Sequence, residues 1–68
     1  MKSISGKEFC KVLEKKDWRL ARINGSHYIY TKQNTSYRIS VLVHKNNALK
    51  IGLLKSLMKL ASISDDEL

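Results

Sequence analysis

Cysteine is almost absent from this 68-residue chain, in which Cys10 is the only one. A single thiol cannot form an internal disulfide, and it offers no thiolate cluster for zinc. We therefore expect Cys10 to be a small core residue. No apolar run approaches the roughly 18 residues of a membrane span. Residues 1–5 lack the apolar stretch of a signal peptide, which favours a cytoplasmic protein.

Acidic residues are also scarce. Six Asp and Glu face thirteen Lys and Arg, so the net charge is +7. Three of the six acids, Asp65, Asp66 and Glu67, lie in the last four residues, so residues 1–64 carry thirteen basic and three acidic side chains, a net of +10. A small domain this basic is typical of proteins that bind a polyanion, most often nucleic acid. The alternative is a merely soluble, lysine-rich surface.

The shortage of acids and histidines limits the chemistry that the chain can perform. His27 and His44 have no Asp or Glu at a spacing typical of metal ligands, so we expect no metal ion. Before the tail, the only carboxylates are Glu8, Glu14 and Asp17, which lie on or just after the first predicted helix, so no Ser–His–acid triad is credible. No glycine-rich phosphate loop occurs, and we expect no cofactor.

The first predicted helix covers residues 6–16. Ser5 and Glu8 have the spacing of a capping box, in which the two residues bond each other's backbone N–H groups. Ile4 and Phe9 occupy the positions of a hydrophobic staple across the same helix start. Apolar residues then recur at helical spacing, which indicates one buried face.

A second helix is predicted over residues 50–61, where leucines and a methionine form a wide apolar face. Gly52 is expected in its first turn, because glycine inside a helix costs about 1 kcal/mol. Ser64 and Glu67 repeat the capping-box spacing, which predicts a last helical turn near the end of the chain.

Three strands are predicted between the helices, over residues 18–23, 26–32 and 37–43. Asn24-Gly25 is the strongest two-residue hairpin signal, because a type I′ turn needs positive φ at both central positions. In the third strand, Tyr37, Ile39, Val41 and Val43 share one face, opposite Arg38, Ser40 and Leu42. The order α-β-β-β-α predicts an α+β, two-layer fold: one domain over residues 1–68, with helices covering one face of a three-stranded antiparallel sheet.

His27 is the best-placed candidate for chemistry, because it follows the predicted turn at the start of a strand. Histidine is the side chain best suited to moving protons near neutral pH. Gly25 permits close approach of another backbone, such as a phosphodiester chain, and Ser26 adds a hydroxyl. In a regular strand Tyr28 and Tyr30 face away from His27, and their rings either stack on bases or belong to the core.

RNA transesterification suits a basic chain with one well-placed histidine. The reaction needs a base for the 2′-hydroxyl, an acid for the leaving oxygen, and cations for the charge on phosphate. Arg22, Tyr28, Lys32 and His44 are the candidate RNA-binding side chains. The residues alone leave two alternatives open: a non-catalytic RNA-binding module, and a basic adaptor that binds only a protein.

Three segments and the start of the first helix resemble the HicA family of bacterial toxins, over nearly the whole chain. They are residues 25–30 (Gly-Ser-His-Tyr-Ile-Tyr), residues 41–44 (Val-Leu-Val-His), residues 52–57 (Gly-Leu-Leu-Lys-Ser-Leu) and the opening residues 5–8 (Ser-Gly-Lys-Glu). The chain departs from the family at Leu42, where proline is frequent, and at Leu53, where a small polar residue is common.

This resemblance implies a double-stranded-RNA-binding-domain-like fold and an mRNA interferase. Such an enzyme is a metal-independent endoribonuclease that cleaves mRNA to inhibit translation and growth, as the toxin of a type II toxin–antitoxin system. The resemblance also implies that His27 corresponds to the family's catalytic histidine, acting as general acid or base. Gly25 and Ser26 would shape its turn. A HicB-like antitoxin protein would bind over the active site, and no membrane takes part.

Overall fold

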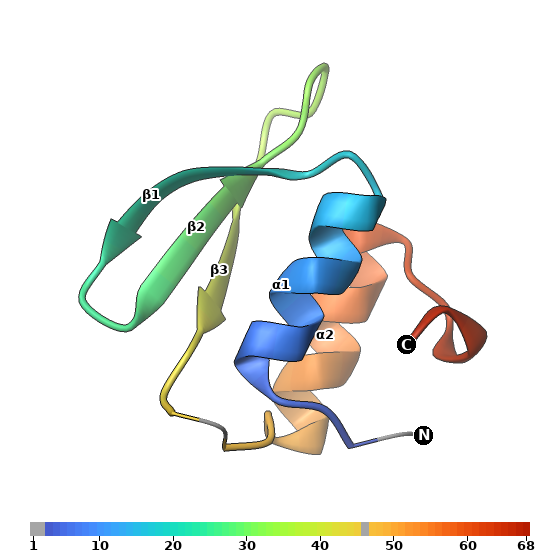
Figure 1. Ribbon diagram of the computed structural model, residues 1–68. Helices are drawn as coiled ribbons and strands as arrows, with labels where there is room; N and C mark the ends of the chain where they lie inside the picture. Colours follow the sequence, from blue (N-terminus) through green and yellow to red (C-terminus); the bar gives the residue numbers. More distant parts are fainter. Residues whose placement is uncertain (1–2, 46) are drawn as a thin grey trace.

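The computed structural model describes residues 3–45 and 47–68 of the chain. The elements follow in the predicted order, with three antiparallel strands in the sheet order β1-β2-β3 (Figure 1). They are α1 (Gly6–Lys15), β1 (Arg19–Asn24), β2 (His27–Thr31), β3 (Ile39–Leu42), α2 (Ile51–Ala61) and a single 3₁₀ turn, η1 (Asp65–Glu67). None of the described helices is long and apolar enough to cross a membrane.

The start of α1 has the predicted capping box. The Glu8 N–H donates to Ser5 Oγ at 3.2 Å, and the Ser5 N–H donates to Glu8 Oε1 at 3.1 Å. Ile4 and Phe9, the predicted staple residues, are both buried. The capping box fixes where the helix begins, and the staple fixes the angle at which the chain enters it.

Both helices end in the same way, with one residue in the left-handed conformation. Asp17 has φ +70°, and the Trp18 N–H donates back to the Leu13 carbonyl at 3.0 Å. Ser62, with φ +58°, and Ile63 repeat this arrangement after α2. This Schellman motif satisfies the last carbonyls of a helix and turns the chain sharply. As a result, Trp18 and Ile63 enter the core, where each is less than a tenth exposed.

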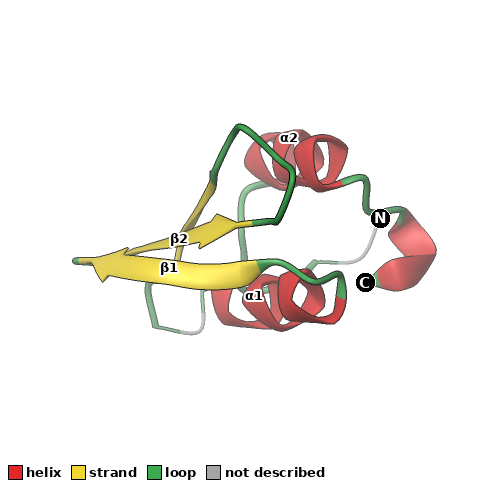
Figure 2. Cartoon of the chain, turned by 90° about the horizontal axis from the view of Figure 1, so that it is seen from above, coloured by secondary structure: helices red, strands yellow, loops and turns green. Residues whose placement is uncertain are grey.

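The two helices cover one face of the sheet, as predicted. Figures 1 and 2 show α1 and α2 side by side, with the strands in a separate layer. Core side chains come from both layers: Phe9, Cys10 and Leu13 from α1, Tyr30, Ile39 and Val41 from the strands, and Leu54, Leu57 and Met58 from α2. Cys10 is therefore a core residue, as expected, and burial raises the pKa of its thiol.

The prediction of a type I′ turn centred on Asn24-Gly25 was wrong by one residue. Asn24 pairs with His27, so the two-residue loop is Gly25-Ser26. Gly25 has φ +62°, whereas Ser26 does not have a positive φ. This pattern fits a type II′ turn, which needs glycine only at its first central position. The Ser26 carbonyl also accepts from the Val43 N–H at 2.8 Å, so the loop position is coupled to the third strand.

The third strand is shorter than predicted, and Tyr37 lies outside it. Tyr37 does not share the covered face with Ile39; it is 45% exposed, and its hydroxyl donates to the Leu60 carbonyl at 2.6 Å. Its ring lies 6.1 Å from that of Trp18, which itself precedes β1 instead of opening it. The alternation of apolar and polar residues does not show where strand pairing stops. Here β2 ends at Thr31, so Tyr37 has no partner in the sheet.

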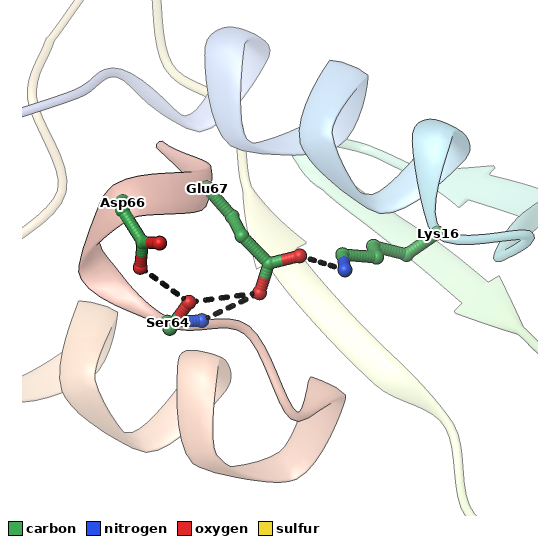
Figure 3. A network of polar contacts seen from close by, with 4 residues as sticks. All are labelled: Lys16, Ser64, Asp66 and Glu67. Carbon is green, nitrogen blue, oxygen red and sulfur yellow. Dashed lines mark hydrogen bonds and ion pairs between the residues drawn. The ribbon is translucent and has the colours of Figure 1, made fainter.

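The predicted last helical turn is present as η1. Glu67 Oε1 accepts from the Ser64 N–H at 2.9 Å and from Ser64 Oγ at 3.0 Å, and Ser64 Oγ also donates to Asp66 at 2.7 Å. Lys16, which follows α1, forms an ion pair with Glu67 (Figure 3). The acidic end of the chain is thereby attached to the helical layer.

Candidate catalytic histidine and nucleic-acid interface

The sheet has one face that the helices leave uncovered. Residues paired across antiparallel strands share a face, and faces alternate along each strand. Since Tyr30 pairs with Ile39 on the covered face, the alternate pairs lie on the other side. We call this side the open face; its residues are Arg19, Arg22, Asn24, His27, Ile29, Thr31, Ser40 and Leu42.

His27 is exposed on the open face, at the first position of β2. Its Nδ1 lies 3.4 Å from Ser40 Oγ on the neighbouring strand, at the long end of the hydrogen-bond range. A hydroxyl both donates and accepts, so Ser40 can pair with Nδ1 in either tautomer of the ring. Nε2 is then the ring nitrogen available for proton transfer to a substrate.

Gly25 and Ser26 lie directly beside His27, where they form the loop of the hairpin. A Cβ added at Gly25 would meet nothing within 4 Å, so this glycine is required by its φ of +62° and not by crowding. The Ser26 carbonyl is bonded to the end of β3. The backbone just before His27 is therefore fixed by the hairpin pairing with β1 on one side and by the hydrogen bond from the Val43 N–H on the other.

Arg22 is a predicted RNA-binding residue that lies diagonally across from His27 on the neighbouring strand. It pairs with Ile29, two residues from His27 on β2, and it is exposed. Diagonal neighbours of this kind are about 7–8 Å apart, within reach of a long side chain. Arg22 and His27 can thus contact the same phosphodiester group.

The two tyrosines of β2 face the helices. Tyr30 is 1% exposed, and its hydroxyl donates to Glu14 Oε2 at 3.1 Å. Burial, assisted by contacts with Cys10 and Glu14, raises its pKa, so the phenol stays protonated. Tyr30 is therefore a core residue. Tyr28 is half-buried on the same covered face, so it does not lie beside His27 as a stacking platform.

Lys32 lies apart from His27, whereas His44 comes two residues after Leu42, which pairs with His27. Lys32 follows the far end of β2, five residues and roughly 16 Å along an extended chain. Its Nζ lies 5.8 Å from the centre of the Trp18 ring. His44 follows β3 and lines a groove of about 360 Å³ together with Leu42 and Leu53. The structure thus separates Lys32 from His27 and places His44 just past the strand position that pairs with His27.

Within residues 3–45 and 47–68, no three His, Cys, Asp or Glu side chains are grouped so that they could hold a metal ion. The two histidines are both exposed. That the reaction needs no metal ion stays a prediction, because the arrangement of side chains does not show how the reaction proceeds.

Ser40 and Arg19 belong to the open face but were missed by the sequence reasoning. The alternation in the third strand already separates Ser40 from the apolar residues. That it contacts His27 depends on the register between β2 and β3, which no local pattern reveals. Arg19 reaches the open face only because β1 is irregular near Ala21.

Comparison with known proteins identifies one family. A family model described as the HicA toxin of bacterial toxin–antitoxin systems matches residues 6–63, from the start of α1 to the residue after the turn that ends α2. This span includes the hairpin, His27 and Ser40. A search of curated proteins finds no match.

Proposed function

We propose that this protein, which belongs to the HicA toxin family of bacterial toxin–antitoxin systems, is a metal-independent endoribonuclease of the cytoplasm. It would cleave mRNA and thereby inhibit translation and growth. The single observation that supports this most directly is His27: exposed on a sheet face without helices, with Nδ1 against Ser40 and with Arg22 nearby.

The reaction is a transesterification within the RNA backbone. The 2′-oxygen loses its proton and bonds to the adjacent phosphorus, the bond from phosphorus to the 5′-oxygen breaks, and that oxygen gains a proton. The products are a 2′,3′-cyclic phosphate and a 5′-hydroxyl end. His27 serves as the general base or the general acid, a role typically worth about 10²- to 10⁴-fold in rate.

Arg22 supplies the electrostatic part of this mechanism. Negative charge builds on the phosphoryl oxygens as the 2′-oxygen attacks, and a fixed cation stabilises it. A planar guanidinium can donate two parallel hydrogen bonds to a phosphate. Gly25 leaves open space in the loop beside His27, since a Cβ added at Gly25 would meet nothing within 4 Å.

A HicB-like antitoxin is the proposed partner. It would bind over the open face and exclude RNA from His27. An acidic antitoxin surface would associate faster with this basic toxin than a neutral one, because opposite charges steer the encounter.

The alternative function is a non-catalytic RNA-binding module with the same double-stranded-RNA-binding-domain-like fold. The net charge of +10 over residues 1–64 favours RNA binding under either proposal. Only the exposed histidine distinguishes them, so His27 is the residue to test.

Replacing His27 with alanine is expected to abolish cleavage and to leave folding and most RNA affinity intact. The side chain is exposed, so its loss opens no core cavity, and such surface changes usually stay within about 0.5 kcal/mol. Turnover of one RNA should fall by about 10²- to 10⁴-fold. The measurement compares turnover, RNA affinity and melting temperature of wild type and variant.

His44→Ala is the matched control, since His44 is also exposed but follows the end of β3, outside the paired strands. It should retain most of the activity. Full activity in a folded His27→Ala protein would refute the catalytic assignment and leave the binding-module alternative. A large drop in melting temperature would show instead that His27 is structural.

A further inference from the structure

Two arginines of β1 share the open face although three positions separate them. In a regular strand, residues 19 and 22 would point to opposite sides, because side chains alternate. Here Arg19 pairs with Thr31 and Arg22 with Ile29, and both partners lie on the open face. The pairing skips Ala21, which marks a β-bulge between Leu20 and Arg22. The extra residue brings the second arginine to the side of His27.

The open face carries positive charge without acidic neighbours among its own residues. Its two arginines and His27 are accompanied only by neutral side chains on the three strands. The acids at the end of the chain lie in the turn beyond the helices, where Glu67 pairs with Lys16 (Figures 1 and 3). An anion approaching the sheet from its open side therefore meets cations first.

The three side chains lie in a row along the hairpin. Arg22 is opposite a residue two positions from His27, and Arg19 is opposite a residue four positions from it, roughly 13 Å away at the rise of a strand. Beyond Arg19 the row ends at a hollow of about 810 Å³, which Thr31 and Lys32 also line. Glu14 and Asp17 form part of that hollow's wall, so the purely basic part of the row ends there.

We propose that Arg19 is a second phosphate-binding residue, and that single-stranded RNA lies along the open face from His27 past Arg22 to Arg19. This proposal rests on the proposed function, since it assumes that the reacting phosphate sits at His27. A single strand is required because the 2′-hydroxyl must swing into line behind its own phosphorus, which a duplex backbone hinders. The β-bulge then serves to place two phosphate contacts on the catalytic side of the sheet.

The first test measures RNA affinity at several salt concentrations in the His27→Ala background, where the RNA stays intact. The probe is a single-stranded oligonucleotide of mixed sequence. Each phosphate contact on a single strand contributes about −0.7 to the slope of log affinity against log salt. Arg19→Gln should therefore make the slope shallower by about 0.7. Lys55→Gln removes the same charge from an exposed position on α2 and should leave the slope unchanged.

The second test uses substrate length in proteins that retain His27. A dinucleoside monophosphate has only the reacting phosphate, so Arg19→Gln should cleave it as well as wild type does. On a longer RNA, Arg19→Gln should raise KM several-fold with little change in kcat, as expected for loss of uniform binding. A structural defect would instead lower cleavage of both substrates equally.

The outcomes separate this proposal from the proposed function. An unchanged salt slope in Arg19→Gln, an equal effect of Lys55→Gln, or a loss independent of substrate length would overturn the role of Arg19. Tighter binding of duplex than of single-stranded RNA would overturn the proposed mode of binding. If wild type cleaves no RNA, the endoribonuclease proposal fails, while the salt slopes still decide whether Arg19 binds phosphate.

Discussion

Gly6 and Gly52 both lie in the first turn of a helix, but only Gly6 has no room for a side chain. A Cβ added at Gly6 would lie 3.2 Å from Cα of Val43 and closer still to the Leu42 carbonyl oxygen. Both contacts are backbone, which cannot rotate away. A Cβ at Gly52 would meet nothing within 4 Å. Glycine at position 6 therefore lets α1 pack directly against the end of β3.

Gly6→Ala is expected to destabilise the protein by about 1–3 kcal/mol, the usual cost of forcing extra volume into a packed site. Gly52→Ala, the same substitution in open space, should stabilise it by up to about 1 kcal/mol, because alanine favours a helix. Denaturant unfolding of both variants measures the difference. Equal effects of the two substitutions would contradict the close approach of α1 to β3.

Among the features of the helices, the left-handed residue that follows the C-terminal end of each one is the least expected. Glycine usually occupies this position, but here it is filled by Asp17 and Ser62. A residue with a Cβ pays about 1–2 kcal/mol for the left-handed conformation. The motif persists because it returns Trp18 and Ile63 to the core, where both are buried.

Ser62→Gly should raise the free energy of unfolding by about 0.5–1 kcal/mol. It removes the strain of a left-handed residue but adds entropy to the unfolded chain, and the first effect is larger. Ser56→Gly is the control, because Ser56 lies exposed inside α2, where glycine costs about 0.5–1 kcal/mol. Thermal melts should move in opposite directions; a shift of the same sign in both would contradict the assignment at Ser62.

For the molecule as a whole, the dominant feature is the separation of charge. Residues 1–64 carry +10, and the last acids lie in η1 against the helical layer. Lys16 and Glu67 are both partly exposed, so their ion pair contributes little to stability. The separation therefore matters for binding more than for folding.

RNA affinity is expected to fall steeply as salt increases, by about 0.7 log units per decade of salt for each phosphate neutralised on a single strand. Titrations of the His27→Ala protein with one RNA at several salt concentrations measure this slope. Asp65→Asn changes a charge in η1, which lies beyond the helices and away from the open face (Figure 1), and should hardly affect the slope. A flat salt response would remove the case for a polyanion partner.

An antitoxin encoded beside this toxin should silence it by covering the open face. At saturation with the co-purified partner, cleavage should stop, and RNA should no longer compete for the surface around His27. The association rate should also decrease with salt, because the partner is expected to be acidic. Persistent cleavage at saturation would contradict inhibition by this partner.

Local pattern in the sequence was sufficient for the helices and for the order of the elements. The Ser5–Glu8 capping box and the alternation from Ile39 to Val41 involve neighbours in the chain, and their energetics are set within a few residues. The exposed position of His27 followed from its place at the start of a strand, directly after a turn. Family membership could also be inferred early, because the Gly-Ser-His segment is contiguous.

Tertiary structure alone decided which of these residues meet. Pairing register is set by contacts between strands, so the loop moved from Asn24-Gly25 to Gly25-Ser26 and Ser40 came to lie against His27. The bulge at Ala21 reversed the alternation of β1 and put Arg19 beside Arg22 on the open face. Such features depend on the fit between distant segments, and that fit has no counterpart in the pattern of any one segment.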